Sequence, residues 1–83
     1  MSFNIIWSEP AARQLQQLDR SIAKRIFDKV GLLRENPARY VQRLVNSPYY
    51  RLRVGDYRVI LDIRRDTLRI LVVKVGHRSL VYD

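Results

Sequence analysis

Six polar side chains in the C-terminal half of the chain have the types needed to bind and cleave a phosphodiester: Arg51, Arg53, Arg58, His77, Arg78 and Tyr82. Guanidinium groups grip phosphate oxygens bidentately and stay charged. Histidine is suited to proton transfer, and tyrosine can stack on a base or move a proton. The set suits RNA cleavage by attack of the substrate's own 2′-OH on the adjacent phosphate, because that reaction asks the protein only for positioning, positive charge and proton transfer.

Within this hypothesis, Arg58 and Arg78 neutralise the non-bridging phosphate oxygens, while Arg51 and Arg53 hold the backbone of the substrate. The residue types leave the general base open, with Tyr82, His77 or no protein group as alternatives, because arginine does not readily give up its proton. The same residues also fit simpler roles. An arginine-rich face suits a solvated surface or a protein docking site, His77 suits a structural position, and Tyr82 can anchor the last strand.

The overall composition agrees with a partner that carries negative charge. The 83 residues include 16 Lys and Arg against 8 Asp and Glu, and the formal net charge of +8 is typical of proteins that meet nucleic acid or an acidic protein. The absence of cysteine and the single histidine predict no disulfide, no metal and no cofactor. No signal peptide or membrane span is recognisable, so we expect one cytoplasmic domain over residues 1–83.

The elements that position these side chains begin with residues 49–64, two alternating runs joined at Gly55-Asp56. The alternation predicts a β-hairpin, and glycine in first place favours a two-residue type II′ turn. This turn pairs Arg53 with Arg58 and predicts a core face of Tyr50, Leu52, Val54, Tyr57, Val59, Leu61 and Ile63. The opposite face is expected to carry Tyr49, Arg51, Arg53, Arg58, Asp62 and Arg64. Like charges placed directly opposite are mildly destabilising, so a bound polyanion is expected to compensate.

The remaining chain supplies further strands and two helices. A short apolar strand is expected at residues 3–7, followed by a helix of about three turns that Ser8 caps and Pro10 helps to start. A second helix begins after Asp19 and ends at Asn36-Pro37, with its apolar stripe at Ile22, Ala23, Ile26, Phe27, Val30 and Leu33. Residues 38–48 are expected to form a loop with an extended piece at residues 41–45. The nearly continuous apolar run at residues 67–75 predicts a strand in a central or doubly covered position.

The predicted order is β-α-α-β-β-β, an α+β fold with an antiparallel sheet and a two-helix hairpin packed on one face. Antiparallel pairing of the last strand with residues 57–64 is expected to place Val73 near Arg58. Strict alternation would then put His77 and Arg78 on opposite faces. A bulge at Gly76 would turn Arg78 toward the arginines.

The element order and the two segments YRLRVGDYRVILDI and VVKVGHRSLVYD resemble the RelE side of the RelE/ParE superfamily of type II toxins. The resemblance spans nearly the whole chain. It implies a metal-independent endoribonuclease that cuts mRNA in the ribosomal A site, and a RelB-like antitoxin that wraps the toxin. A ribosomal group then joins the candidates for the general base.

The resemblance also implies roles for individual positions. Arg58 matches the family arginine after the GDY turn, Arg78 the arginine after the last strand's glycine, Tyr82 the near-terminal tyrosine, and Arg51 a basic residue before the turn. Arg53, Tyr49 and His77 are expected RNA contacts, with Tyr49 at or near the position of a family lysine.

Two alternatives remain. A ParE-like inhibitor of DNA gyrase would remain toxic after Arg78→Ala, and an inactive member acting only in antitoxin-complex regulation would allow normal growth of a host without antitoxin.

Overall fold

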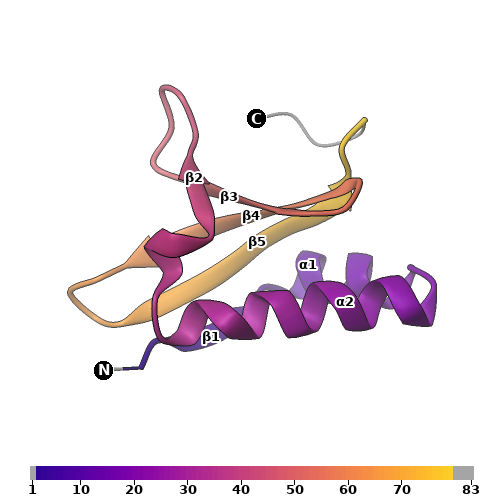
Figure 1. Cartoon of the computed structure of the whole chain (residues 1–83), viewed down its shortest axis with the longest axis horizontal. Coiled ribbons are helices and arrows are strands. Elements are labelled where there is room, and N and C mark those ends of the chain that lie inside the picture. The colour runs from indigo at the N-terminus through magenta and orange to yellow at the C-terminus, as the bar shows by residue number, and fades with distance from the viewer. Residues whose placement is uncertain (1, 80–83) are drawn as a thin grey trace.

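The computed structural model describes residues 2–79, and its elements follow the α+β order expected from the sequence. They are β1 (Asn4–Trp7), α1 (Glu9–Gln16), α2 (Arg20–Gly31), short 3₁₀ turns at Leu32–Arg34 and Pro37–Arg39, β2 (Val41–Arg43), β3 (Tyr50–Val54), β4 (Tyr57–Arg64) and β5 (Arg69–His77). Figure 1 shows both helices on one side of the sheet, while the connection from β2 to β3 rises on the other side. The predicted layering of a helix pair on one sheet face is confirmed.

The sheet is mixed rather than wholly antiparallel, which corrects one part of the prediction. In the described residues the strand order is β1-β5-β4-β3-β2, and β1 runs parallel to β5 with Asn4 opposite Arg69. β2 is an additional edge strand where only an extended piece was expected, and it pairs antiparallel with β3. The direction of β1 could not be read from the sequence because no short turn links it to β5. The central position predicted for β5 is confirmed.

The β3–β4 hairpin has the predicted register throughout. Val54 lies opposite Tyr57 and Arg53 opposite Arg58. Gly55 has a φ of +58°, and within residues 2–79 the non-glycine residues with positive φ do not include Asp56. Positive φ at the first loop residue alone is the pattern of a type II′ turn.

The helix starts were predicted correctly and their lengths less well. The Ser8 hydroxyl accepts a hydrogen bond from the Ala11 N–H at 3.2 Å, which confirms it as the cap of α1. α1 has 8 residues, about two turns rather than three. It ends early because α2 already begins at Arg20, with Asp19 at the N-cap position but without a side-chain capping hydrogen bond. α2 itself ends at Gly31, and a 3₁₀ turn continues as far as Arg34.

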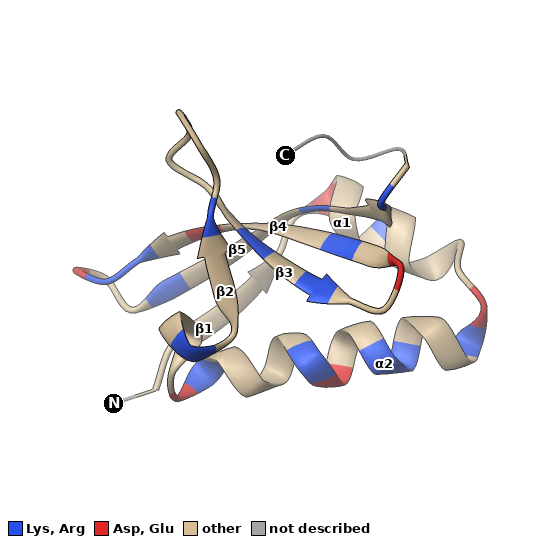
Figure 2. Cartoon of the chain, turned by 45° about the horizontal axis from the view of Figure 1, so that its top comes forward, with Lys and Arg blue, Asp and Glu red and all other residues tan. Residues whose placement is uncertain are grey.

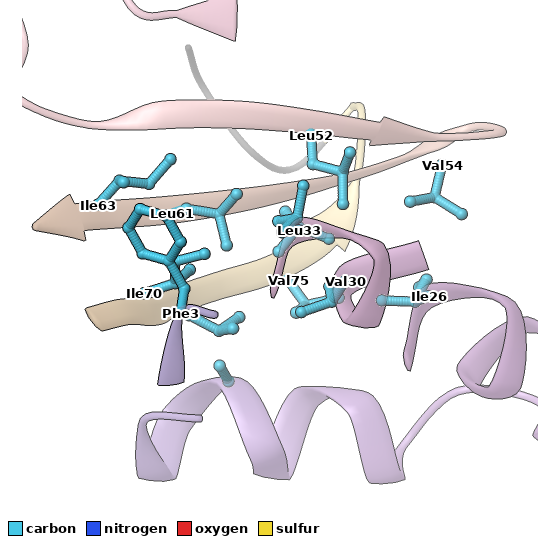
Figure 3. Close-up of a cluster of buried hydrophobic side chains, with 13 residues drawn as sticks. Phe3, Ile26, Val30, Leu33, Leu52, Val54, Leu61, Ile63, Ile70 and Val75 are labelled. Atoms are coloured by element: carbon cyan, nitrogen blue, oxygen red, sulfur yellow. The ribbon is translucent and has the colours of Figure 1, made fainter. Parts of the chain in front are cut away.

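The main core lies between the helices and the inner face of the sheet, as Figure 3 shows. Ile26, Val30 and Leu33 pack there against the inner residues of the hairpin. Phe27 was expected in the same stripe but is 53% exposed, and its ring stacks on Trp7 of β1 with centroids 5.9 Å apart. Among the described residues, no helix is both long and apolar enough to span a membrane.

Candidate phosphate-binding face

Arg51, Arg53 and Arg58 lie together on the sheet face that the helices leave open, and we call these three residues the arginine face. Arg53 lies directly opposite Arg58, and Arg51 is two residues along the same strand. Arg51 and Arg58 are half-buried, and Arg53 is exposed. Figure 2 shows the positive segments of β2, β3 and β4 close to one another. The hairpin turn therefore brings three guanidinium groups onto one surface, as the sequence predicted.

The electrostatics of Arg51 reflect this crowding. The pKa of Arg51 is lowered from its usual value, first by burial and then by repulsion from Arg58 and Arg53. Arg51 Nη2 also donates a hydrogen bond of 2.5 Å to Gln42 Oε1 on the neighbouring strand β2. A bound anion would relieve the repulsion, so the arginine face favours a ligand with negative charge.

Further along β4 the charges are balanced within the protein. Arg64 Nε donates to Asp62 at 3.2 Å, and the Asp62 side chain is 19% exposed. Arg64 lies opposite Arg69 on β5, but the adjacent carboxylate offsets that pair. Asp62 and Arg64 thus belong to the predicted outer face, but as an ion pair they add no net charge to it.

The register of β5 differs from the prediction. Gly76, not Val73, lies opposite Arg58, and Lys74 lies opposite Ile60. The ladder shifts between Ile60 and Leu61, which leaves Val73 as the extra residue. The bulge is therefore at Val73 rather than at Gly76.

This register separates His77 from the arginine face. His77 pairs with Tyr57, which packs against the main core, and the two rings meet edge to face with centroids 5.4 Å apart. His77 Nδ1 lies 2.9 Å from the Ser79 hydroxyl. His77 also lines a pocket with Gln14 and Leu18 from the helical side. The structure therefore does not bring His77 to the three arginines.

Arg78 follows β5 directly and lies beside the hairpin turn. Its N–H donates to the Asp56 carbonyl at 2.8 Å, and its side chain is exposed. Because Gly76 lies opposite Arg58, Arg78 follows two residues later, at the end of the sheet formed by the β3–β4 turn, next to Arg53 and Arg58 in the register. Tyr82, the fourth expected catalytic residue, lies outside the described residues.

Two features of this face were not predicted. Ile60 and Leu44 are buried there and pack with Val73 in a second small apolar cluster. Lys74 of β5 is exposed opposite Ile60. The sequence does contain a signal for the apolar cluster. Ile60 stands between Arg58 and Asp62 on the predicted outer face, and an apolar side chain there has to be shielded from water by another segment. Lys74 could not be assigned a face without the bulge at Val73.

Tyr49 lies at the edge of the arginine face, just before β3. Its side chain is 38% exposed, and its carbonyl accepts a hydrogen bond from the Leu44 N–H at 3.0 Å.

Within residues 2–79, no group of three or more His, Cys, Asp or Glu side chains is arranged to hold a metal ion.

The sequence matches the model of the ParE toxin of type II toxin–antitoxin systems over residues 5–82. This range covers nearly the whole chain, and the protein therefore belongs to the ParE toxin family, within the RelE/ParE superfamily that the motifs resemble. No match is found among curated proteins.

Solved structures that match this fold include RelE proteins and their RelB complexes. The RelBE2 toxin–antitoxin complex from Mycobacterium tuberculosis matches with a TM-score of 0.83 at 22% identity, covering 94% of this chain and 100% of that one. The RelE–RelB complex from Pyrococcus horikoshii matches with a TM-score of 0.82 at 24% identity, covering 98% and 100%. The RelB–RelE complex from Methanococcus jannaschii matches with a TM-score of 0.73 at 25% identity, covering 94% and 95%. The fold is that of the RelE structures.

Proposed function

We propose that this type II toxin is an endoribonuclease that cleaves mRNA in the ribosomal A site without a metal. The observation that carries the proposal is the clustering of Arg51, Arg53 and Arg58 on the open sheet face, where their mutual repulsion favours a phosphate ligand. The match to RelE structures supports the same reading at the level of fold.

In the proposed reaction, the 2′-oxygen of one nucleotide forms a bond to the adjacent phosphorus as its proton leaves. The bond from phosphorus to the 5′-oxygen breaks, and that oxygen takes up a proton. The products are a 2′,3′-cyclic phosphate and a 5′-hydroxyl end. Arg58 and Arg78 stabilise the charge on the non-bridging oxygens, and Arg51 and Arg53 hold the flanking backbone. Tyr82 takes the role of base stacking or proton transfer.

His77 pairs with Tyr57, whose side chain lies on the core face of the sheet. In this proposal His77 therefore contributes to RNA binding only from the face opposite the three arginines. It is therefore a less direct contact than the arginines in this proposal. The candidates for the general base are Tyr82, a ribosomal group and no group at all, and the pairing of His77 with Tyr57 disfavours the fourth candidate, His77.

The proposal includes a protein partner. The similar structures from Mycobacterium tuberculosis and Methanococcus jannaschii are toxin–antitoxin complexes, and a RelB-like antitoxin is the corresponding partner here. An acidic antitoxin would neutralise the net charge of +8. A substrate on the ribosome places the toxin in the cytoplasm.

Cleavage of mRNA on programmed ribosomes tests the proposal. The wild type is expected to cut, and Arg58→Ala to lower the cleavage rate about 10²-fold or more, as for the loss of a transition-state charge contact. Arg20→Ala, at the exposed start of α2, is the matched control and should cut normally. A wild-type protein that leaves the mRNA intact contradicts the proposal.

The family model favours a second candidate function, because it describes the ParE toxin. A ParE-like protein would inhibit DNA gyrase by binding it. Inhibition of supercoiling by the wild type, retained in Arg58→Ala, would support this candidate over the endoribonuclease.

A further inference from the structure

A pocket with a volume of about 310 Å³ opens beside the arginine face, beneath the connection from β2 to β3. Its lining residues are Leu44, Val45, Asn46, Ser47, Tyr49, Ile60, Val73 and Lys74. Ile60 lies opposite Arg51 in the hairpin, so the pocket adjoins the arginines directly. The volume is at the lower end of the ~300–1,000 Å³ typical of ligand sites.

The pocket combines an apolar floor with a polar rim. Leu44 and Ile60 are 8% and 5% exposed, and they form the floor with Val73. Tyr49 stands at the rim with 38% of its surface exposed, and Lys74 is exposed on β5. An aromatic ring, an apolar floor and a nearby cation are the groups that hold an unstacked nucleotide in single-stranded RNA.

The connection that covers the pocket is braced by two hydrogen bonds and by a buried side chain. The Leu44 N–H donates to the Tyr49 carbonyl at 3.0 Å, and the Tyr49 N–H donates to the Ser47 hydroxyl at 3.1 Å. Asn46 takes a positive φ of 55°, which asparagine tolerates better than most residues. The buried Leu44 side chain fixes the segment to the sheet. A preorganised pocket of this kind loses little entropy when it binds.

We infer that this pocket accepts one unpaired base of the RNA strand whose phosphate lies on the arginine face, and so selects the codon that is cut. The inference rests on the proposed function. The base stacks on Tyr49 over the apolar floor, and the side chains of Asn46 and Ser47 offer hydrogen bonds to its edge. Lys74 contacts the neighbouring phosphate, opposite Arg51 across the pocket.

The test is the cleavage profile across codons on programmed ribosomes, measured for the wild type and pocket variants. Tyr49→Ala is expected to lower cleavage at preferred codons about 10-fold and to flatten the preference, the size expected for lost base stacking. Tyr49→Phe should keep the wild-type profile because it keeps the ring. Lys74→Ala should lower cleavage similarly at every codon, because a phosphate contact carries no sequence information.

Asn46→Gly tests readout of the base edge, since glycine keeps the positive φ and removes the amide. It is expected to change which codons are preferred without a uniform loss of rate. Thermal unfolding of each variant checks that the sheet still folds.

Tyr40→Ala is the matched control, because Tyr40 is 36% exposed but lies outside the pocket, beside Arg39. It should leave the profile unchanged. Normal wild-type cleavage with an unchanged profile in Tyr49→Ala and Asn46→Gly overturns the inference and leaves the proposed function intact. The same result with weakened antitoxin binding would assign the pocket to the antitoxin, and no cleavage by the wild type would overturn both proposals.

Discussion

Replacing Arg53 with glutamine should stabilise the folded protein while it weakens RNA cleavage. Arg53 is exposed and lies directly opposite Arg58, so the substitution removes a like-charge pair across two strands. The pKa of Arg51 is lowered first by burial and then by repulsion from Arg58 and Arg53, so Arg53 also acts on its neighbour along the strand. Stability and activity should therefore change in opposite directions.

The expected gain in the free energy of unfolding is about 0.5 kcal/mol, within the ~0.2–1 kcal/mol range of cross-strand pairs. For a domain of this size, that gain corresponds to an increase in Tm of roughly 2–4 °C. The gain should shrink in ~1 M salt, where the Debye length is only about 3 Å. Differential scanning calorimetry at low and high salt measures both values.

Arg64→Gln is the matched control for Arg53→Gln. Arg64 also faces an arginine across the sheet, Arg69, but it is paired with Asp62 at 3.2 Å. Its replacement should bring no gain in Tm. The reasoning is refuted if Arg53→Gln fails to raise Tm at low salt, or if the gain persists undiminished in high salt.

Three further substitutions test the elements that position the site. Gly55→Ala should lower the free energy of unfolding by about 1–2 kcal/mol, because φ at this residue is +58°, and urea denaturation measures the loss. Ser8→Ala should cost about 1 kcal/mol in the same measurement through loss of the α1 cap, and a variant as stable as the wild type would show that the cap contributes nothing. Gln14→Ala should speed hydrogen exchange of the Val75 amide, which donates to Gln14 Oε1 at 2.8 Å; an unchanged rate would mean that this bond does not protect the strand edge.

The part of the site that depends on local signals could be predicted from the sequence. Gly55-Asp56 and the period-two alternation around it determine the hairpin register, which places Arg53 opposite Arg58. Turn geometry and side-chain alternation act over a few residues, so no distant contact was needed.

The part that depends on distant contacts could not be predicted. The bulge at Val73 lies where the segment after β1 meets β5, since the Ser8 hydroxyl donates to the Val73 carbonyl at 3.2 Å and the Ser8 N–H to the Val72 carbonyl at 3.0 Å. These residues are about 65 positions apart in the chain. The bulge decides which face Lys74 takes, and so the pocket beside the arginines was not visible in the sequence.

The central claim is that the arginine face holds the phosphate that is cut, and a sulfur substitution tests it most directly. Ribosomes are programmed with mRNA in which sulfur replaces one non-bridging oxygen at the scissile phosphate, and cleavage is measured for the wild type and Arg58→Ala. The account predicts that sulfur slows the wild type and has little further effect on Arg58→Ala, because the contact it weakens is already lost. An equal slowing of both proteins by sulfur would contradict it.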